Sequence, residues 1–358
     1  MKIKDIKSIL KKKGKKIEKP RKYLSSGSTL LNLACSGNMR GCFVGGGYYF
    51  FVGDSASGKT FISLTCLAEA SYNKDFNDHR FIYDNSEGGA LMDIRKFFGK
   101  RVANKIEPPK FDEDGEPEYS STIEEFYYAV DDAIRDGRPF IYILDSMDSL
   151  SSKDETEKFE ETKTAHRKGK VTTGSYGDGK AKKNSANLRR LLKPLGKTDS
   201  ILIIINQTRD NLGFGFEKKT RSGGHALRFY ACVEIWSSIR EKIKKTIKGK
   251  KRQLGIVANI QVKKNRLTGR ERSVLVPIYH SYGIDNVGSC VDYLIEETYW
   301  KKKGNKISAP EFEFTGTREK LIHTIEKNNL EKDLIDLVDE QWTAIEMASR
   351  IKRKIRYE

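Results

Sequence analysis

Five short runs of apolar, β-branched and aromatic residues stand out along the chain. They comprise residues 48–52, 80–83, 140–144, 201–205 and 255–262. Runs of about four to eight such residues, bounded by charged or glycine-rich stretches, predict strands that are buried on both faces. A sheet with both faces covered requires helices on each side of it.

Segments with helical spacing of apolar residues lie between these runs, at 60–72, 123–134 and 186–195. Strands that alternate with helices predict an α/β fold with a mostly parallel central sheet. Loops that carry function are then expected at the carboxyl ends of the strands, where a doubly covered sheet leaves its edge open.

Other stretches depart from this pattern. Residues 151–183 are highly charged and then rich in Gly, Ser and Thr, and residues 208–224 combine glycines with basic residues, so both are predicted to be long surface loops. Residues 317–356 have helical character. We therefore expect a basic N-terminal arm at 1–27, an α/β core at 28–287 and a small C-terminal α/β domain at 288–358.

Composition changes this picture mainly through charge. Hydrophobic residues make up 37% of the 358 residues and charged residues 32%, and no apolar run approaches the roughly 20 residues that cross a bilayer. The sequence predicts a cytoplasmic protein with no membrane partner. The net charge is +18. Residues 1–22 hold eleven Lys/Arg and two acidic residues, so this segment alone carries half of the net charge. Such an excess favours a polyanionic partner, with nucleic acid first.

A phosphate-binding loop follows the first predicted strand. Residues 53–60 match the pattern G-x-x-x-x-G-K-[ST] in full, between a predicted strand and a predicted helix. Glycines let backbone N–H groups face the phosphates, and the helix presents its positive end to them. Lys59 is expected to reach the β- and γ-phosphates, and Thr60 to hold Mg²⁺. The predicted ATP-binding residues are Gly53, Asp54, Ser55, Ala56, Ser57, Gly58, Lys59, Thr60 and Asp145.

Acidic residues follow two other predicted strands. Asp145 comes directly after the run at 140–144, which suits a carboxylate that steadies Mg²⁺ together with Thr60. Glu87 lies just past the run at 80–83, where a carboxylate would orient and deprotonate the attacking water. That role favours a hydrolase over a kinase, which shields its phosphate from water. Asp84 directly follows the same run and stays open as the alternative to Glu87, which is the expected catalytic carboxylate.

Taken together, these residues resemble the RecA family, including its phage relatives of the UvsX type. The most specific stretch is I-I-I-N-Q-T-R at 203–209, followed by G-G-H-A-L-R-F-Y-A at 223–231. It is similar to the family's Asn-Gln switch, its second DNA-binding loop and the helix that closes that loop. The resemblance spans roughly residues 25–325 and implies a RecA-like P-loop ATPase core that uses ATP and Mg²⁺.

The resemblance also implies two DNA-binding loops. Gln207 would sense the γ-phosphate and couple it to the loop at 208–224, where aromatic residues would stack on bases and cations would meet phosphates. The first loop would lie near 174–180. The residues implied to contact DNA are Tyr176, Lys180, Arg209, Phe214, Phe216, Lys218, Lys219, Arg221, Gly223 and Gly224.

A basic pair, Lys264 and Arg266, resembles the family residues that reach the ATP of the neighbouring subunit. Residues two apart on a strand share one face, so both cations are expected to point the same way. A basic pair on a solvated edge is the alternative interpretation. The resemblance implies a helical filament of identical subunits with single-stranded and double-stranded DNA as partners, and single-strand-binding and mediator proteins as further partners.

The sequence departs from the family pattern at several places. No tyrosine clearly matches the family's adenine-stacking position, and the segment between Asp145 and the first loop is longer than in bacterial relatives. The C-terminus, 350–356, is basic where bacterial RecA has an acidic tail, so autoinhibition by such a tail is not expected. A compact, lysine-rich, diverged sequence suggests a phage protein in the host cytoplasm.

The sequence thus predicts a DNA-dependent ATPase and recombinase with five catalytic residues. These are Lys59, Glu87, Gln207, Lys264 and Arg266. A RecA-fold ring helicase would share the P-loop and Asp145, yet it has no need for the G-G-H-A-L-R stretch. An annealing or mediator protein would use ATP only to set its affinity for single-stranded DNA.

Binding to single-stranded DNA is expected to weaken steeply as salt rises, because neutralising several phosphates per protomer releases counterions. A fluorescence titration over a series of salt concentrations measures this slope. Replacing Lys218, Lys219 and Arg221 with Ala should flatten it. Replacing Phe214 and Phe216 should instead weaken binding at every salt concentration, because stacking releases no counterions. An affinity that hardly changes with salt would point to a different partner.

Overall fold

The computed structural model describes residues 21–88, 92–168, 179–210, 219–221 and 224–353, with only the backbone considered at 209–210 and 219–221. In the first half of the chain the elements are β1 (Tyr23–Leu24), α2 (Thr29–Ser36), β2 (Phe43–Val44), β3 (Tyr48–Gly53), α3 (Lys59–Tyr72), β4 (Arg80–Asp84), α4 (Ile94–Phe98), α5 (Lys100–Lys105), β5 (Lys110–Phe111), β6 (Pro117–Glu118), α6 (Ile123–Arg135), β7 (Phe140–Leu144) and α7 (Lys153–Arg167). In the second half they are α8 (Gly179–Thr198), β8 (Ile201–Asp210), β9 (Lys219–Arg221), α9 (His225–Tyr230), β10 (Val233–Ile247), β11 (Lys250–Asn265), β12 (Arg272–Tyr279), β13 (Gly283–Ile284), α10 (Asn286–Glu296), β14 (Lys301–Lys303), β15 (Lys306–Ala309), β16 (Phe314–Gly316), α11 (Arg318–Lys327) and α12 (Glu331–Ala348).

One large sheet organises the molecule, with strand order β13-β12-β11-β10-β3-β8-β7-β4 and β9 paired to β8. Strands β10, β3, β8, β7 and β4 run parallel, whereas β11, β12 and β13 continue the sheet in antiparallel fashion. The predicted α/β fold with a mostly parallel sheet is confirmed, and all five predicted strands form. Sequence patterns missed β10, whose apolar residues are interspersed with charged ones, and β12, whose apolar run is interrupted by Pro277.

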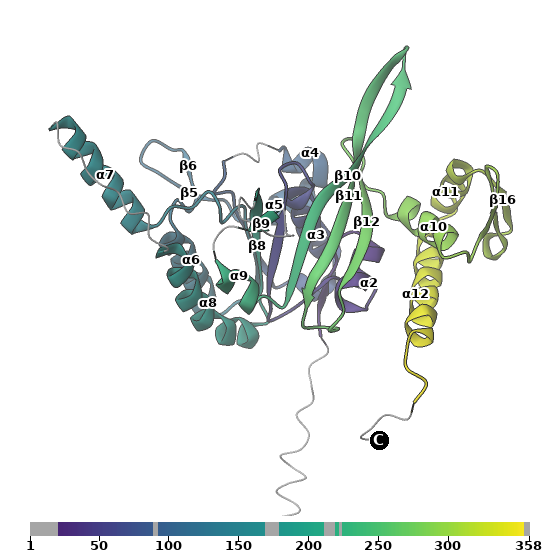
Figure 1. Cartoon of the computed structure of the whole chain (residues 1–358), viewed down its shortest axis with the longest axis horizontal. Coiled ribbons are helices and arrows are strands. Elements are labelled where there is room, and N and C mark those ends of the chain that lie inside the picture. The colour runs from purple at the N-terminus through teal and green to yellow at the C-terminus, as the bar shows by residue number, and fades with distance from the viewer. Residues whose placement is uncertain (1–20, 89–91, 169–178, 211–218, 222–223, 354–358) are drawn as a thin grey trace, which may run out of the picture.

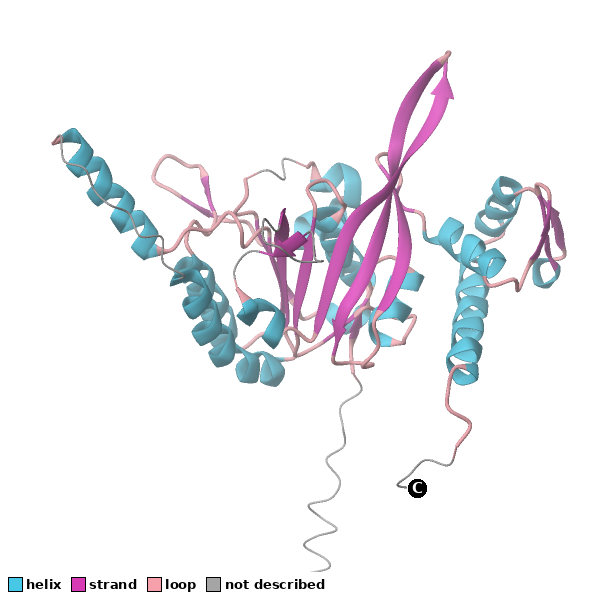
Figure 2. Ribbon diagram, in the orientation of Figure 1, coloured by secondary structure: helices cyan, strands magenta, loops and turns pink. Residues whose placement is uncertain are grey.

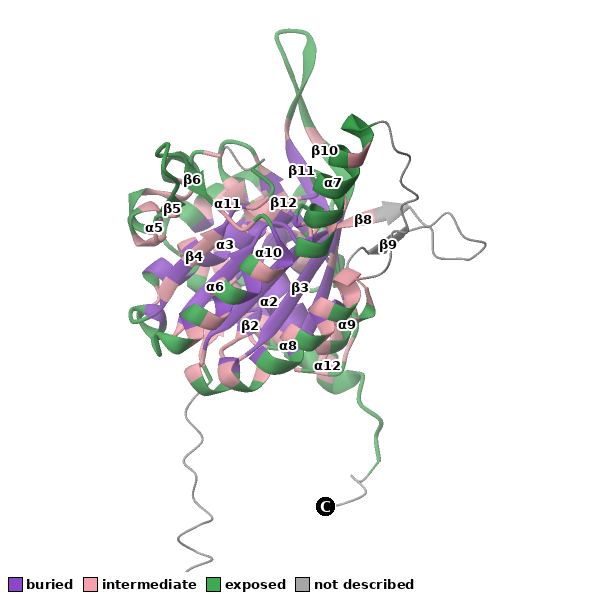
Figure 3. Ribbon diagram, turned by 90° about the vertical axis from the view of Figure 1, so that its left-hand side faces the viewer, coloured by how far each residue is buried: buried purple, intermediate pink, exposed green. Residues whose placement is uncertain are grey.

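Helices cover both faces of the central strands, which explains their unbroken apolar sequence. On β3, Tyr49 and Phe51 pack into one cluster with residues of α2 and α3. Tyr48, Phe50 and Val52 alternate with them and pack into a second cluster with residues of α6 and α8. Figure 3 shows these strands as the buried centre of the molecule. Period-two alternation along a strand therefore builds two separate cores.

A long hairpin extends β10 and β11 beyond the body of the sheet (Figure 1). The pair runs from Val233↔Asn265 to Ile247↔Lys250, and a two-residue turn with positive φ at Lys248 and Gly249 closes it. Both turn residues in left-handed conformation are typical of a type I′ hairpin turn. The outer half of the ribbon is exposed and lysine-rich.

The prediction of a surface loop at 151–183 is wrong for the described residues. Helix α7 occupies Lys153–Arg167, and α8 begins at Gly179. The physical reason is local: Ser152 and Glu155 form a capping box, and the ensuing residues are good helix formers. No residue of α7 is buried, so the helix projects from the body as an isolated cylinder (Figure 2).

The predicted loop at 208–224 is partly strand. Strand β8 continues through Asp210, and β9 returns antiparallel to it, with Thr208 opposite Arg221 and Asp210 opposite Lys219. Residues 211–218 and 222–223 lie outside the described residues. The proposed DNA contacts Phe214, Phe216, Lys218 and Gly223 fall there, and Tyr176 falls in another such segment, 169–178.

The C-terminal elements lie beside the antiparallel end of the main sheet (Figure 1). Helix α12 is held against β12 by ion pairs from Arg270 and Arg272 to Glu346, and the guanidinium of Arg272 lies 4.9 Å from the ring centroid of Trp342. The helical character predicted for 317–356 extends only to Ala348 among the described residues. In the described part of the chain, no helix is both long and apolar enough to cross a membrane.

Candidate functional site

The phosphate-binding loop joins the carboxyl end of β3 to the first turn of α3. Gly53 must be glycine, because a Cβ there would lie 2.3 Å from the carbonyl oxygen of Ser237 on β10. Gly58 has φ of 93°, a left-handed conformation that favours glycine, and it has no side chain to cap α3. The first amides of α3 are therefore left to a ligand, and the helix end favours an anion.

Lys59 is folded into this loop. Its Nζ donates to the carbonyl oxygens of Gly53 at 2.9 Å and Asp54 at 2.7 Å. Burial lowers the pKa of Lys59, while the carboxylates of Asp145 and Glu87 act in the opposite direction. The cation is thus held at the loop, close to the acidic side of the site.

Thr60 and Asp145 meet across 85 residues of sequence. The hydroxyl of Thr60 donates to Oδ2 of Asp145 at 2.7 Å, and the hydroxyl of Tyr83 donates to the same oxygen at 3.2 Å. Burial raises the pKa of Asp145, and these hydrogen bonds oppose the rise. A hydroxyl and a carboxylate side by side are hard oxygen ligands of the kind that Mg²⁺ takes alongside phosphate and water.

The two carboxylates past β4 have different surroundings. Glu87 lies on the P-loop side, where its Oε1 accepts a hydrogen bond from Nε2 of Gln207 at 2.8 Å. Asp84 is buried and accepts from the hydroxyls of Ser120 and Tyr142, each at 2.7 Å, and from the amide of Ser120 at 3.1 Å. Asp84 thus anchors the structure on the other side of β4. This geometry favours Glu87 as the catalytic carboxylate.

Strands β8 and β10 are tied to the P-loop and its surroundings through three residues that the sequence did not single out, Thr208, Asp148 and Ser237. Thr208 donates from its hydroxyl to the carboxylate of Asp54 in the P-loop, and the amide of Gln207 donates to the carboxylate of Asp148. Ser237 donates to the carbonyl of Ser57 at 2.7 Å. Thr208 lies within the quoted I-I-I-N-Q-T-R stretch, but a lone threonine carries no signal of its partner.

Of the predicted DNA contacts, Lys180 and Gly224 lie near the start of α8. Gly224 caps α9 with φ of 82°, and a Cβ there would lie 2.7 Å from Cβ of Ala181. Lys180 Nζ donates to the carbonyl of Leu150 at 2.9 Å and pairs with Glu155 at 3.0 Å. The backbones of Arg209, Lys219 and Arg221 lie on the β8–β9 ribbon.

Lys264 and Arg266 point the same way, toward the carboxyl end of α9. Lys264 Nζ donates to the carbonyls of Arg228 at 2.6 Å and Phe229 at 2.7 Å, and Arg266 donates to that of Phe229 at 2.7 Å. Burial, and then the neighbouring Arg266, lower the pKa of Lys264 to about 8. Cations at this end of a helix are favoured by its dipole.

These two cations lie far from the P-loop of their own chain. The amide of Arg266 donates to Cys232, whose amide donates to Tyr48, so Arg266 lies level with the first residue of β3. The P-loop begins at Gly53, five residues further along that strand, which is about 17 Å. The sheet therefore holds the basic pair and the phosphate loop toward opposite ends of β3.

Together, the fold and the site define an α/β protein with a P-loop ATPase core. A family model described as the RecA N-terminal domain matches residues 126–285. Protein RecA of Trichodesmium erythraeum is 28% identical over 314 residues, covering 85% of this chain and 76% of that protein. Protein RecA of Clostridioides difficile is 28% identical over 299 residues, covering 82% and 75%.

Protein RecA of Lactococcus lactis subsp. cremoris strain MG1363 is 27% identical over 282 residues, which cover 78% of this chain but only 65% of that protein. The chain is therefore similar to RecA proteins over most of its length, and its middle part matches the RecA N-terminal domain. The alignment with Protein RecA of Trichodesmium erythraeum covers 85% of this chain, so it extends from the P-loop region into the C-terminal elements.

Glu87→Gln is expected to lower ATP turnover by about 10²–10⁴-fold, the usual contribution of a positioned general base, while ATP still binds. Steady-state hydrolysis and titration with a fluorescent ATP analogue measure the two effects. Asp84→Asn is the matched control. It should lower the free energy of unfolding by about 1–3 kcal/mol, since buried donors lose a charged acceptor, yet leave turnover per folded molecule nearly unchanged. The reverse pattern would assign catalysis to Asp84.

Proposed function

We propose that this chain is an ATP-dependent DNA recombinase that forms filaments on single-stranded DNA and catalyses homologous pairing and strand exchange. DNA-dependent hydrolysis of ATP drives cycles of filament assembly and release. Double-stranded DNA is the second partner, and the similarity to RecA proteins supports the assignment. The cytoplasmic location and the single-strand-binding and mediator partners stay predictions of the sequence.

The observation that carries this proposal is the contact between Gln207 and Glu87. Gln207 Nε2 is 2.8 Å from Glu87 Oε1, and the next residue, Thr208, bonds to Asp54 of the P-loop. Strand β8 continues from these residues into the segment proposed to bind DNA. A change at the γ-phosphate that moved Glu87 or Asp54 would therefore be transmitted through these hydrogen bonds to the start of that segment. Hydrolysis and DNA affinity would be coupled through two hydrogen bonds.

The site residues have separate tasks in hydrolysis. Thr60 and Asp145 would hold Mg²⁺, which when bound neutralises charge on the β- and γ-phosphates. The first amides of α3 would bind the phosphate oxygens, and Lys59 would move from the loop carbonyls to the γ-phosphate as negative charge grows there. Glu87 would take the proton of the attacking water, and Gln207 would orient its carboxylate.

Lys264 and Arg266 are proposed to act on the ATP of a neighbouring subunit. Within one chain they lie toward the end of β3 opposite the P-loop, too far for their side chains to reach that loop. A head-to-tail assembly would bring one subunit's basic pair to the next subunit's nucleotide. ATP would then hold the filament together, in the manner of an arginine finger, and hydrolysis would loosen it.

A decisive test of the function compares three outcomes with one preparation. A recombinase should hydrolyse ATP faster with single-stranded DNA, form helical filaments in electron micrographs, and exchange strands with a homologous duplex. Lys59→Ala protein is the control and should have no turnover, because it lacks the charge that stabilises the transition state. Closed rings that unwind DNA would support the helicase instead. Annealing of complementary strands without exchange would support the mediator.

A mixing experiment tests the trans site. Lys264→Ala/Arg266→Ala protein should bind ATP in its own P-loop yet hydrolyse it poorly, and Lys59→Ala protein should not hydrolyse it either. Mixed together, the two should regain part of the DNA-dependent activity, because some interfaces then pair an intact P-loop with intact cations. Labelled subunits report whether mixed filaments form. If mixed filaments form and no ratio restores hydrolysis, the trans assignment is wrong.

A further inference from the structure

The first turns of α8 lie beside the described ends of both proposed DNA-binding segments. Lys180 and Lys183 belong to these turns, and Lys180 is the last residue of the segment expected to form the first DNA loop. The end of the second segment approaches the same place, because Gly224 packs so closely on Ala181 that a Cβ would lie 2.7 Å away. Two cations at this junction are well placed for a phosphate of the DNA backbone.

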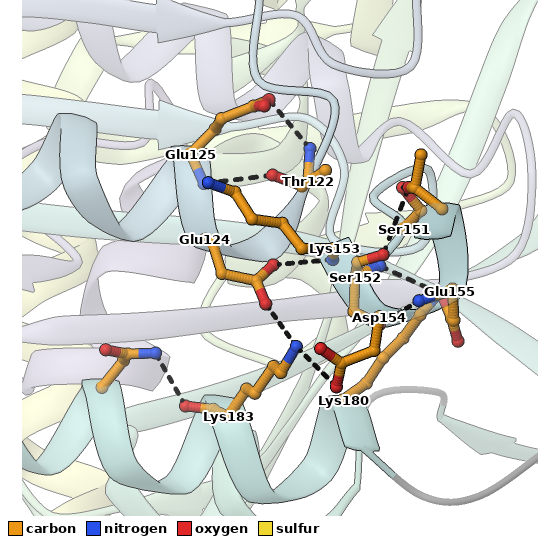
Figure 4. A network of polar contacts seen from close by, with 12 residues as sticks. Thr122, Glu124, Glu125, Ser151, Ser152, Lys153, Asp154, Glu155, Lys180 and Lys183 are labelled. Atoms are coloured by element: carbon orange, nitrogen blue, oxygen red, sulfur yellow. Dashed lines mark hydrogen bonds and ion pairs between the residues drawn. The ribbon is translucent and has the colours of Figure 1, made fainter. Parts of the chain in front are cut away.

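In the structure these two cations are covered by carboxylates (Figure 4). Lys180 Nζ is 3.0 Å from Oε2 of Glu155, and Lys183 Nζ is 3.0 Å from Oδ2 of Asp154. Lys183 also pairs with Glu124 of α6, and this bond raises the pKa of Lys183. Asp154 and Glu155 form the first turn of α7, so one short segment supplies carboxylate oxygens to both lysines.

The attachment of α7 holds these carboxylates in place. Ser152 and Glu155 form the capping box, and the amide of Lys153 donates to Glu124 at 3.2 Å. Beyond this first turn α7 buries no residue, so the helix has no packing role in the core. Its acidic start stands out in a chain of net charge +18. The lysine side chains remain 34% and 24% exposed, which leaves them accessible to an anion from solvent.

We propose that Lys183 joins Lys180, already expected to contact DNA, in a binding site for the phosphodiester backbone, and that Asp154 and Glu155 occupy this site until DNA displaces them. The acidic turn of α7 thereby acts as a built-in competitor of DNA. Carboxylate oxygens resemble phosphate oxygens as acceptors for lysine. Ion pairs this exposed contribute little to stability, so replacing the carboxylates with a DNA phosphate costs little free energy. The inference rests on the proposed binding of single-stranded DNA.

Neutralising the competitor should strengthen DNA binding. Asp154→Asn/Glu155→Gln protein keeps the helix cap, since Gln serves at that position of a capping box. We expect its affinity for a labelled oligothymidylate, with Mg²⁺ and a non-hydrolysable ATP analogue, to rise about five-fold or more. The dependence on salt should become steeper, because each newly contacted phosphate adds roughly 0.7 to the slope.

The matched control is Glu160→Gln/Glu161→Gln, which changes net charge by the same amount on the same helix. Glu160 pairs with Lys163, away from α8. This variant should bind DNA nearly as the wild type does. In a Lys180→Gln/Lys183→Gln background the Asp154→Asn/Glu155→Gln gain should vanish. Circular dichroism verifies that every variant keeps its helix content.

If Asp154→Asn/Glu155→Gln and Glu160→Gln/Glu161→Gln raised the DNA affinity equally, net charge alone would explain the gain. The proposal that the acidic turn competes with DNA would then be wrong. A gain that persists without the two lysines would overturn the phosphate site. No gain in Asp154→Asn/Glu155→Gln protein, with wild-type protein binding DNA normally, would also reject the inference while leaving the proposed function intact. Failure of the wild type and all variants to bind single-stranded DNA with the ATP analogue would instead reject the proposed function itself.

Discussion

Burial of the central strands on both faces is the constraint on which the rest of the structure depends. Because β3, β7 and β8 are covered by helices on each side, their polar residues can only lie at the ends of the strands. The parallel direction brings those ends to one edge of the sheet. Gly53 ends β3, Asp145 follows β7, and Gln207 of β8 pairs with Gly53, so the three converge although they are far apart in sequence.

The same architecture separates charges of opposite sign. Carboxylates of Asp145, Glu87 and Asp54 surround the P-loop, where they would face a metal-bound triphosphate. Cations without a place in that site gather on outlying elements, such as the β10–β11 ribbon and the carboxyl end of α9. A chain of high positive charge can thus gather carboxylates around its phosphate loop, because burial and distance decide which charges interact.

Several elements followed from the sequence and several did not. The P-loop was evident because its glycines and lysine perform one task within eight consecutive residues. Helix α7 was missed because its charged sequence lacks an apolar face, although the Ser152 and Glu155 capping box marked its start. Glu87 was preferred over Asp84, but spacing alone could not settle the choice, since residues three apart at a strand end can turn to either side of the sheet.

The sequence by itself determined the class of fold, the phosphate loop and the RecA resemblance, because each depends on local patterns: apolar runs, a contiguous motif, a specific stretch after β8. Only the tertiary structure decided the partners. Thr208 meets Asp54, Lys180 meets Glu155, and Lys264 meets the end of α9 through contacts between segments distant along the chain. Such contacts arise from how strands are ordered in the sheet, and no local pattern of residues specifies that order.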